Sequence, residues 1–123
     1  MKIKKKIVLI GMMGSGKSTI GALLSKKINM KFIDLDQKIE TIEKQTISQI
    51  FKLKGEKYFR AIEVKTILSL LDSREKELVL SLGGGSILDE KVRMNVKNNS
   101  LSFWLVPYCR KQVKIFESIF FPL

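Results

Sequence analysis

The stretch GMMGSGKST, residues Gly11–Thr19, decides the fold of this chain. It matches the pattern G-x-x-x-x-G-K-[ST], in which backbone amides and a lysine hold the phosphate groups of a nucleotide. The apolar run Ile7–Ile10 before it predicts a buried parallel strand. After it, apolar residues recur at helical spacing: Ile20, Leu23, Leu24 and Ile28. Strand, loop and helix in this order are the context that the motif requires, so we expect a nucleotide site here.

The loop residues have physical reasons to be there. Glycines let the backbone approach phosphates without an intervening Cβ, and successive N–H groups at a helix N-terminus form an anion-binding concavity. Lys17 is predicted to reach the β- and γ-phosphates, and Ser18 is predicted to place its hydroxyl on Mg²⁺. The residues expected to bind ATP are Gly14, Ser15, Gly16, Lys17, Ser18 and Thr19.

Length and composition indicate one ordinary globular domain. The chain has 123 residues, of which 45% are hydrophobic, which is enough for a single core. Its one cysteine, Cys109, cannot form an intramolecular disulfide, which favours a reduced, cytoplasmic setting. No apolar run approaches the length of a membrane span. The basic start Met1–Lys6 is not interpreted as a signal peptide, because the glycine loop stands where a cleavage site would be.

The chain is strongly basic, with a formal net charge of +11. The lysines are scattered, and arginines and aromatic residues do not alternate as a base-reading surface requires. We therefore interpret the charge as a lysine-rich solvated surface that serves anionic substrates, rather than as a nucleic-acid interface.

Strand and helix patterns alternate along the chain, which predicts a parallel α/β sheet. The expected strands are Lys5–Ile10, Lys31–Asp34, Glu77–Leu82 and Leu101–Val106, the third of them ended by three glycines. The expected helices are Lys17–Ile28, a helix capped by Asp36 that runs to about Lys44, a helix opened by a capping box at Thr46–Gln49 that runs to Leu53, Glu56–Leu71 and Asp89–Val96.

Three further motifs follow the loop: DLD at Asp34–Asp36, GEKYFRAIE at Gly55–Glu63 and GGG at Gly83–Gly85. In this order and spacing, over about residues 5–105, the chain resembles shikimate kinases. The resemblance implies transfer of the γ-phosphate of ATP to the 3-hydroxyl of shikimate, with Mg²⁺, in aromatic amino-acid biosynthesis. It also implies a P-loop kinase fold with a parallel sheet of order 2-3-1-4-5 and flanking helices.

The resemblance also implies roles for the two aspartates. Asp34 lies at the carboxyl end of its strand and would hold the magnesium shell together with Ser18. Asp36 would accept a hydrogen bond from the substrate hydroxyl and activate it, which makes Asp36 and Lys17 the expected catalytic residues. The plainer role for Asp36 is helix capping, and one residue can do both.

The remaining implied roles concern the substrate. Arg60 would grip the substrate carboxylate with its planar fork, and its plainer role is a surface pair with Glu56 or Glu63. The three glycines Gly83, Gly84 and Gly85 would let backbone amides approach the substrate, and their plainer role is a turn after a strand. Phe51 and Phe59 are interpreted as packing or as a pocket wall.

The motif pattern ends near Leu105, and residues 106–123 diverge. We expect these 123 residues to contain neither the family's lid nor its second carboxylate-binding arginine, and Arg110 is given no role. We interpret the change as a truncated or frameshifted version of the family, with the last strand missing. The tail residues Phe116, Ile119 and Phe120 would then cover part of the exposed sheet as a short helix.

Several functions remain open at this stage. The expected partners are shikimate and ATP, bound by a monomer, with no nucleic acid and no membrane. A different P-loop kinase, acting on gluconate or a nucleotide, would share the loop but not the other three motifs together. A catalytically defective remnant would bind ATP without turnover. A basic nucleic-acid module would bind DNA or RNA in a salt-dependent way.

Overall fold

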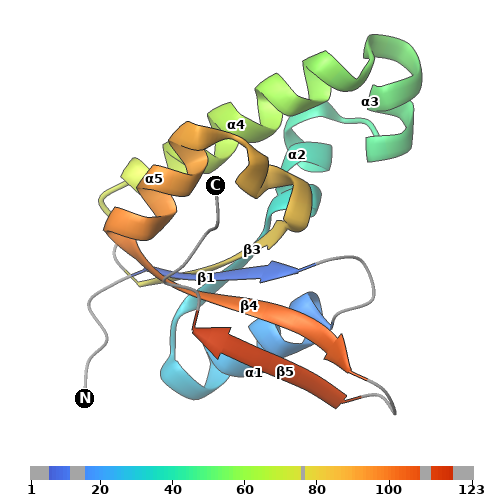
Figure 1. The fold of residues 1–123 in the computed structure, drawn as a ribbon. Coiled ribbons are helices and arrows are strands. Elements are labelled where there is room, and N and C mark those ends of the chain that lie inside the picture. Colours follow the sequence, from blue (N-terminus) through green and yellow to red (C-terminus); the bar gives the residue numbers. More distant parts are fainter. Residues whose placement is uncertain (1–5, 12–15, 76, 109–111, 118–123) are drawn as a thin grey trace.

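The computed structural model describes residues 6–11, 16–75, 77–108 and 112–117. Strands and helices alternate through most of the chain (Figure 1). The strands are β1 (Lys6–Gly11), β2 (Lys31–Asp34), β3 (Leu78–Gly83), β4 (Ser100–Tyr108) and β5 (Gln112–Glu117). The helices are α1 (Lys17–Ile28), α2 (Leu35–Glu43), α3 (Ile47–Lys54), α4 (Glu56–Asp72), the 3₁₀ helix η1 (Gly84–Leu88) and α5 (Glu90–Asn99). The predicted elements are confirmed, with ends that differ by at most three residues, and η1 stands where only a turn was expected.

The sheet has the order β2-β3-β1-β4-β5. The first four strands in this order pair in parallel, which confirms the predicted order 2-3-1-4. Parallel strands end at the same edge of a sheet. The ends of β1, β2 and β3 therefore lie side by side, and three of the four sequence motifs begin there, at Gly11, Asp34 and Gly83.

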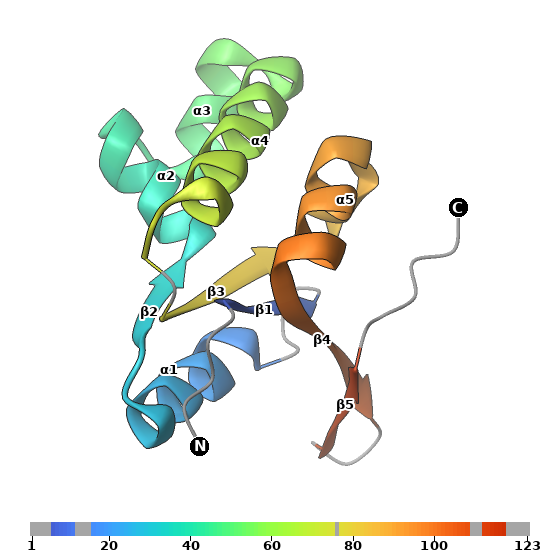
Figure 2. The ribbon, with the colours of Figure 1, turned by 90° about the vertical axis from the view of Figure 1, so that its left-hand side faces the viewer.

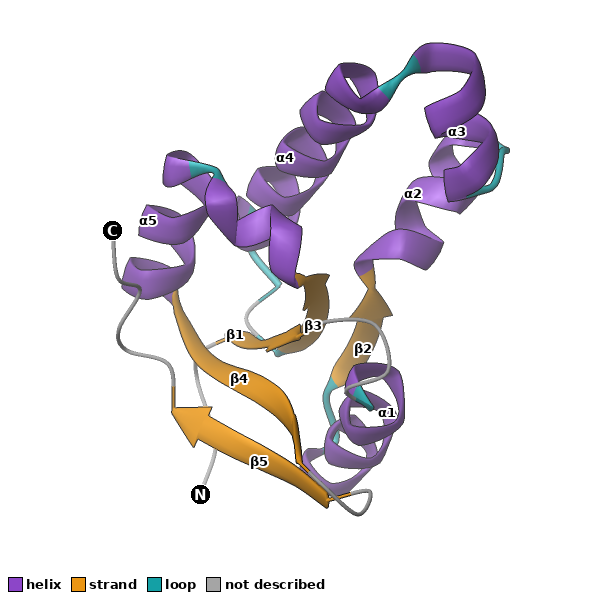
Figure 3. Cartoon of the chain, turned by 45° about the vertical axis from the view of Figure 1, so that its right-hand side comes forward, coloured by secondary structure: helices purple, strands orange, loops and turns teal. Residues whose placement is uncertain are grey.

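The fifth strand corrects two expectations. Residues Gln112–Glu117 form a strand that pairs antiparallel with β4, from Tyr108↔Gln112 to Phe103↔Glu117 (Figure 3). The segment around Phe116 is thus a strand and not a short helix, and a fifth strand is present, although it is not parallel to its neighbour. The sequence QVKIFE is rich in β-branched and aromatic residues, and only three residues separate it from β4, which suits a hairpin. Ile119 and Phe120 lie outside the described residues.

Helices cover both faces of the sheet (Figure 2). One face packs against α1, where Ile7, Leu9 and Val79 form a core with Ile20 and Leu24. The opposite face packs against α2, α4 and α5 and holds the larger core; its fully buried members include Val8, Ile10, Leu35, Ile67, Leu80, Leu82 and Val92. Strand β1 is buried along its whole length between the two layers, as the apolar run Ile7–Ile10 predicts.

Local signals set the helix ends. Helix α1 ends at Ile28 and is capped by Asn29, which has a left-handed φ of 56°. Thr46 caps α3, and Thr46 and Gln49 form the reciprocal capping box that the sequence predicts. Gly55 separates α3 from α4 with a φ of 88°, a conformation that strongly favours glycine. Phe59 is buried in the larger core, which confirms packing for this ring, while Phe51 is 38% exposed and its ring centroid lies 4.8 Å from that of Phe59.

Candidate active site

The start of α1 presents the described part of the phosphate-loop motif. Gly16 adopts a left-handed φ of 85° before the helix, and Lys17, Ser18 and Thr19 form the first helical turn. The Ser18 hydroxyl donates a hydrogen bond of 2.8 Å to Asp34 Oδ2 at the end of β2. The structure therefore brings together the two residues that the sequence assigns to a metal. Gly14 and Ser15 lie outside the described residues, so their role stays a prediction.

Asp34, and not Asp36, caps helix α2. Asp34 Oδ1 accepts hydrogen bonds from the backbone N–H groups of Asp36 at 3.0 Å and Gln37 at 3.4 Å. The reason is positional: Asp34 keeps extended backbone angles at the end of β2, as an N-cap residue does, while Asp36 already lies inside the helix. This corrects the expectation that Asp36 caps, and it leaves the Asp36 carboxylate without a capping role.

Asp36 lies among several charges at the start of α2. Partial burial raises the pKa of its carboxyl group above the ordinary value, and the neighbouring Asp34 carboxylate raises it further. The Lys17 ammonium acts in the opposite direction and lowers the pKa, while Glu63 and Glu40 add smaller increases. Helices α1, α2 and α4 thus bring an aspartate with a raised pKa within electrostatic reach of the loop lysine, an arrangement typical of a site that moves protons.

Arg60 points from the first half of α4 toward a buried partner. Its Nη1 donates to Glu63 Oε1 at 2.8 Å, and its Nε lies 4.0 Å from Glu56 Oε1. The Glu63 side chain is only 5% exposed, whereas that of Arg60 is 42% exposed. The pair is therefore more than a surface pair: a buried carboxylate holds one side of the guanidinium, and the rest of the fork stays accessible.

The sequence interpretation undervalued Glu63, which it treated only as a surface partner of Arg60. A signal was available. Phe59, Glu63 and Ile67 recur every four residues and share the buried face of α4. A charged residue at a core-facing position requires a charged partner, and the nearest candidate in the sequence is Arg60.

The last of the three glycines, Gly85, lies against this arginine. Gly83 ends β3, and Gly84 and Gly85 open η1. A Cβ added at Gly85 would lie 2.8 Å from Arg60 Nη1, whereas one added at Gly83 would meet nothing within 4 Å. Gly85 is thus the position at which the absence of a side chain lets the guanidinium lie against the turn.

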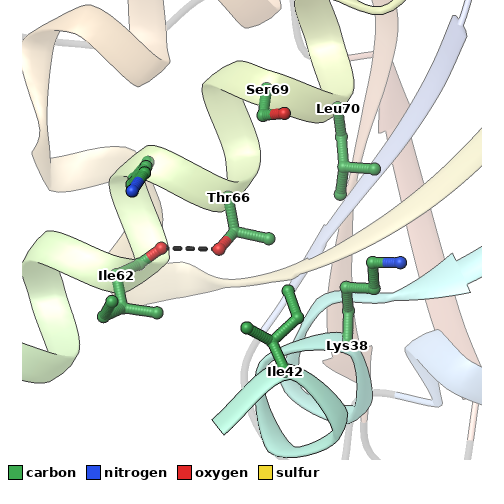
Figure 4. Close-up of a pocket in the computed structure, with 7 residues that line it drawn as sticks. Lys38, Ile42, Ile62, Thr66, Ser69 and Leu70 are labelled. Atoms are coloured by element: carbon green, nitrogen blue, oxygen red, sulfur yellow. Dashed lines mark hydrogen bonds between the residues drawn. The ribbon is translucent and has the colours of Figure 1, made fainter.

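Two hollows border α4. One of about 510 Å³ is lined by Arg60, Ala61, Val64, Lys65, Leu68, Asp89 and Lys91, between α4 and the start of α5. The other, of about 220 Å³, lies between α2 and α4 and is lined by Lys38, Ile42, Ile62, Lys65, Thr66, Ser69 and Leu70 (Figure 4). The Thr66 hydroxyl in this second hollow donates to the Ile62 carbonyl at 2.7 Å. Only the first hollow includes a residue of the site described above.

These features agree with the outcome of comparing the chain with known proteins. The family model for shikimate kinase matches residues 13–118, a range that includes the β4–β5 hairpin. The chain belongs to the shikimate kinase family. The shikimate kinase of Persephonella marina is 46% identical over 101 residues, covering 82% of this chain and 60% of its own length. That of Bartonella quintana is 41% identical over 102 residues, covering 83% of this chain and 48% of its own length.

Solved shikimate kinase structures share the fold. The enzyme from Acinetobacter baumannii, in complex with shikimate, superposes with a TM-score of 0.79 at 34% identity, over 84% of this chain and 56% of that one. The enzyme from Aquifex aeolicus gives 0.76 at 38% identity, over 82% and 63%. A gluconokinase from Sinorhizobium meliloti, at 22% identity and a TM-score of 0.56, shares the fold alone. The chain spans about half to three-fifths of the length of the curated relatives named above.

Two kinds of feature are absent from the described residues: a helix that could span a membrane and a cluster of metal-binding side chains. None of the helices in this part of the chain is long and apolar enough to cross a bilayer. Within the same residues, no group of three or more histidine, cysteine, aspartate or glutamate side chains gathers as a metal cage.

Proposed function

We propose that this chain transfers the γ-phosphate of ATP to the 3-hydroxyl of shikimate. The observation that carries the proposal is the convergence, at one sheet edge, of Lys17 from α1, Asp36 from α2 and the Arg60–Glu63 pair from α4. A cation for phosphates, a carboxylate for a hydroxyl and an arginine fork for a carboxylate are the three groups that phosphorylation of a hydroxy acid requires. Membership of the family favours shikimate over gluconate or a nucleotide as that acid.

Arg60 would bind the substrate carboxylate. A guanidinium presents parallel N–H groups that match the two oxygens of a carboxylate. Glu63 occupies one donor, Nη1, at 2.8 Å, which fixes the plane of the fork and leaves other donors for the ligand. Gly85 leaves room for the guanidinium to lie against the turn, because a Cβ at this position would come within 2.8 Å of Nη1. This preorganisation reduces the entropy that substrate binding must overcome.

Asp36 would orient the attacking hydroxyl and accept its proton. A general base works best when its pKa lies near the working pH, and burial together with Asp34 moves the pKa of Asp36 in that direction. Lys17 lies close enough to moderate this shift, so the base and the phosphate-binding cation belong to one electrostatic unit. In phosphoryl transfer most of the rate enhancement comes from positioning and from stabilising charge, and Lys17 would supply such charge at the γ-phosphate.

Ser18 and Asp34 fit Mg²⁺. Their oxygens lie 2.8 Å apart, and one carboxylate with one hydroxyl is a typical protein contribution to a magnesium site that also uses nucleotide phosphates. The ion would neutralise phosphate charge during transfer. Capping of α2 fixes the Asp34 carboxylate in place, so the metal ligand is held by the same bonds that start the helix.

The remaining assignments complete the proposal. Gly14, Ser15, Gly16 and Thr19 would contribute backbone amides to the phosphates, and Gly83, Gly84 and Gly85 would let the backbone approach shikimate. We propose a monomer in the cytoplasm that acts on small molecules without a nucleic-acid or membrane partner. The single cysteine and the nucleotide motif support that setting.

A coupled assay for ADP formation with Mg²⁺-ATP tests the proposal, with and without shikimate and with gluconate as the competing acid. We expect shikimate-dependent turnover that Asp36→Asn lowers at least about 10²-fold while ADP binding is retained. Equal rates with gluconate and with shikimate would refute the proposal that shikimate is the specific substrate. ADP binding without turnover on any acid would instead identify a nucleotide-binding chain that is not a kinase as it stands.

A further inference from the structure

Arg93, in the first turn of α5, donates from its guanidinium to two backbone carbonyls at the end of η1. Its Nη1 lies 3.2 Å from the Ile87 oxygen and 3.1 Å from the Leu88 oxygen. The side chain is half-buried, and among the described residues it has no ion-pair partner. The interactions of this charge are therefore directed at the 3₁₀ helix.

The position of Arg93 indicates that it serves more than its own helix. The macrodipole opposes a positive side chain in the first turn of a helix, because the positive end of the dipole lies there. The start of α5 is already capped, since Asp89 Oδ1 accepts the Val92 N–H at 3.0 Å. Helical side chains lean toward the N-terminus, so an arginine at this position reaches back over the cap to the preceding segment. What Arg93 adds therefore concerns η1.

The two carbonyl groups need a partner of this kind. A short helix leaves its last carbonyl groups without an acceptor role inside the helix. No backbone N–H of the described residues donates to the Ile87 or Leu88 oxygen from another element or from a loop. The Ile87 side chain is buried in the larger core, whereas that of Leu88 is 80% exposed. Arg93 thus anchors the end of η1 at a point where the last side chain of this helix does not.

The start of the same 3₁₀ helix lies against Arg60. Helix η1 is only five residues long, contacts both α4 and α5, and carries Gly85, where a Cβ would come within 2.8 Å of Arg60 Nη1. Glu63 belongs to the same helix as Arg60, so it fixes the guanidinium only relative to α4. Gly85 is the contact that relates the guanidinium to the end of β3. One end of η1 therefore meets the arginine of the candidate site, and the other end is held by Arg93.

We propose that Arg93 is a positioning residue for the substrate site: by holding the two carbonyls at the end of η1, it fixes the glycine turn against Arg60. The inference deepens the proposed function, because it rests on Arg60 and the glycine turn as the elements that bind shikimate. Arg93 does not contact the ligand and acts through the backbone of η1. A turn that is already fixed reduces the ordering that substrate binding must otherwise include.

The test compares Arg93→Met, Arg93→Lys and Lys97→Met with the wild type. Methionine keeps an apolar stem without donors, and lysine keeps the charge without the fork. Lys97 is the matched control because it is exposed in the last turn of α5, where its charge favours the helix, so its loss affects the stability of α5 at the end away from η1. The readouts are KM for shikimate and for ATP, and hydrogen–deuterium exchange of the η1 amides, which requires no turnover.

For Arg93→Met we expect KM for shikimate to rise about tenfold, the lower end of the effect of one lost charge-assisted hydrogen bond. KM for ATP and kcat should stay within about twofold. Exchange of the η1 amides should accelerate at least about tenfold, while exchange in β1 stays unchanged. Arg93→Lys should recover part of the shikimate affinity, and Lys97→Met should leave both readouts as in the wild type.

A double variant tests the route through the glycine turn. If Gly85→Ala and Arg93→Met both act on the placement of Arg60, their combined effect on KM for shikimate should be smaller than the product of the two single effects. Effects that multiply fully would show that the two positions act independently, which would overturn the proposed route.

Three other results would overturn the inference: an unchanged KM for shikimate in Arg93→Met, an equal rise of KM for both substrates, which would indicate a merely structural arginine, or unchanged exchange of the η1 amides. If the methionine variant does not fold, Arg93→Lys carries the same comparison. A wild-type chain that does not bind shikimate would refute the proposed function, and the exchange of η1 would then decide by itself whether Arg93 fixes the turn.

Discussion

Replacing Gly85 by alanine tests the substrate half of the site with little risk to the fold. The new Cβ would lie 2.8 Å from Arg60 Nη1, 3.0 Å from Nη2 and 3.2 Å from Cζ, all below the 3.4 Å at which ordinary contact begins. The atoms that must move belong to the far end of a flexible side chain, and the backbone at Gly85 lies outside the region that requires glycine. We therefore expect the variant to fold and its guanidinium to be displaced.

The size of the effect follows from that displacement. Relief of the contact needs a shift of roughly 0.6 Å at Nη1, which also disturbs the 2.8 Å bond to the buried Glu63. A charge-assisted hydrogen bond contributes about 1.5–3 kcal/mol, so a misaligned fork should weaken shikimate binding about 10- to 150-fold. Misplacement of a positioning group by about 1 Å can cost a comparable factor in rate.

The assay compares KM for shikimate and for ATP in Gly85→Ala and in Gly83→Ala. Gly83 is the matched comparison because its Cβ would meet nothing within 4 Å and its φ of −72° suits alanine. We expect KM for shikimate to rise in Gly85→Ala far more than in Gly83→Ala, with KM for ATP and the thermal midpoint nearly unchanged. Shikimate affinity within twofold of the wild type in Gly85→Ala would refute the argument that the position of the Arg60 guanidinium depends on the absence of a side chain at this glycine.

Three further predictions concern individual side chains. Asp36→Asn should lower kcat at least about 10²-fold. The same substitution should raise the thermal midpoint at neutral pH, because the raised pKa of Asp36 means that ionisation of its carboxyl group destabilises the fold. This gain should vanish when pH falls through that pKa, and a midpoint that the substitution leaves unchanged at every pH would contradict the reasoning. Glu63→Gln keeps the shape of the side chain but removes the charge that holds Arg60, so KM for shikimate should rise about tenfold with KM for ATP unchanged, and an equal rise in both would indicate a general packing defect. Thr46→Ala removes the α3 cap and should lower the free energy of unfolding by about 1 kcal/mol in urea titrations without affecting ADP binding.

Most of the fold could be predicted because its signals are local. The apolar run of β1, the helical spacing of α1 and the capping box of α3 each depend on a few adjacent residues, and all three are confirmed. The fifth strand could not be predicted in this way. A hairpin forms from the pairing of two segments, and the sequence of Gln112–Glu117 favours a strand only once β4 offers an edge to pair with.

The candidate site, like the fold, could be predicted where its signals are local and not where they depend on tertiary contacts. The motifs identified Ser18, Asp34, Asp36 and Arg60, and the structure places them at one sheet edge. The cap of α2 was predicted at Asp36 instead of Asp34, because residue propensities locate the end of a helix only to within one or two residues. The partner of Arg60 was underestimated for a different reason: the burial of Glu63 is a tertiary property, although the four-residue repeat of α4 indicated it.

Capping of α2 by Asp34 instead of Asp36 affects the chemistry of the carboxyl groups at the end of β2. Asp34 accepts hydrogen bonds from two backbone N–H groups and from the Ser18 hydroxyl. Asp36, two residues later, accepts none of these bonds, loses solvent and faces the charge of Asp34, so its pKa rises. One short segment at the end of β2 thus carries a carboxylate that hydrogen bonds hold beside Ser18 and a second carboxylate whose raised pKa suits it to take up a proton. Asp34→Asn should remove the carboxylate that is proposed to hold the metal. Because the charge of Asp34 raises the pKa of Asp36, the substitution should also lower that pKa, and the acid limb of the pH–rate profile should move to lower pH.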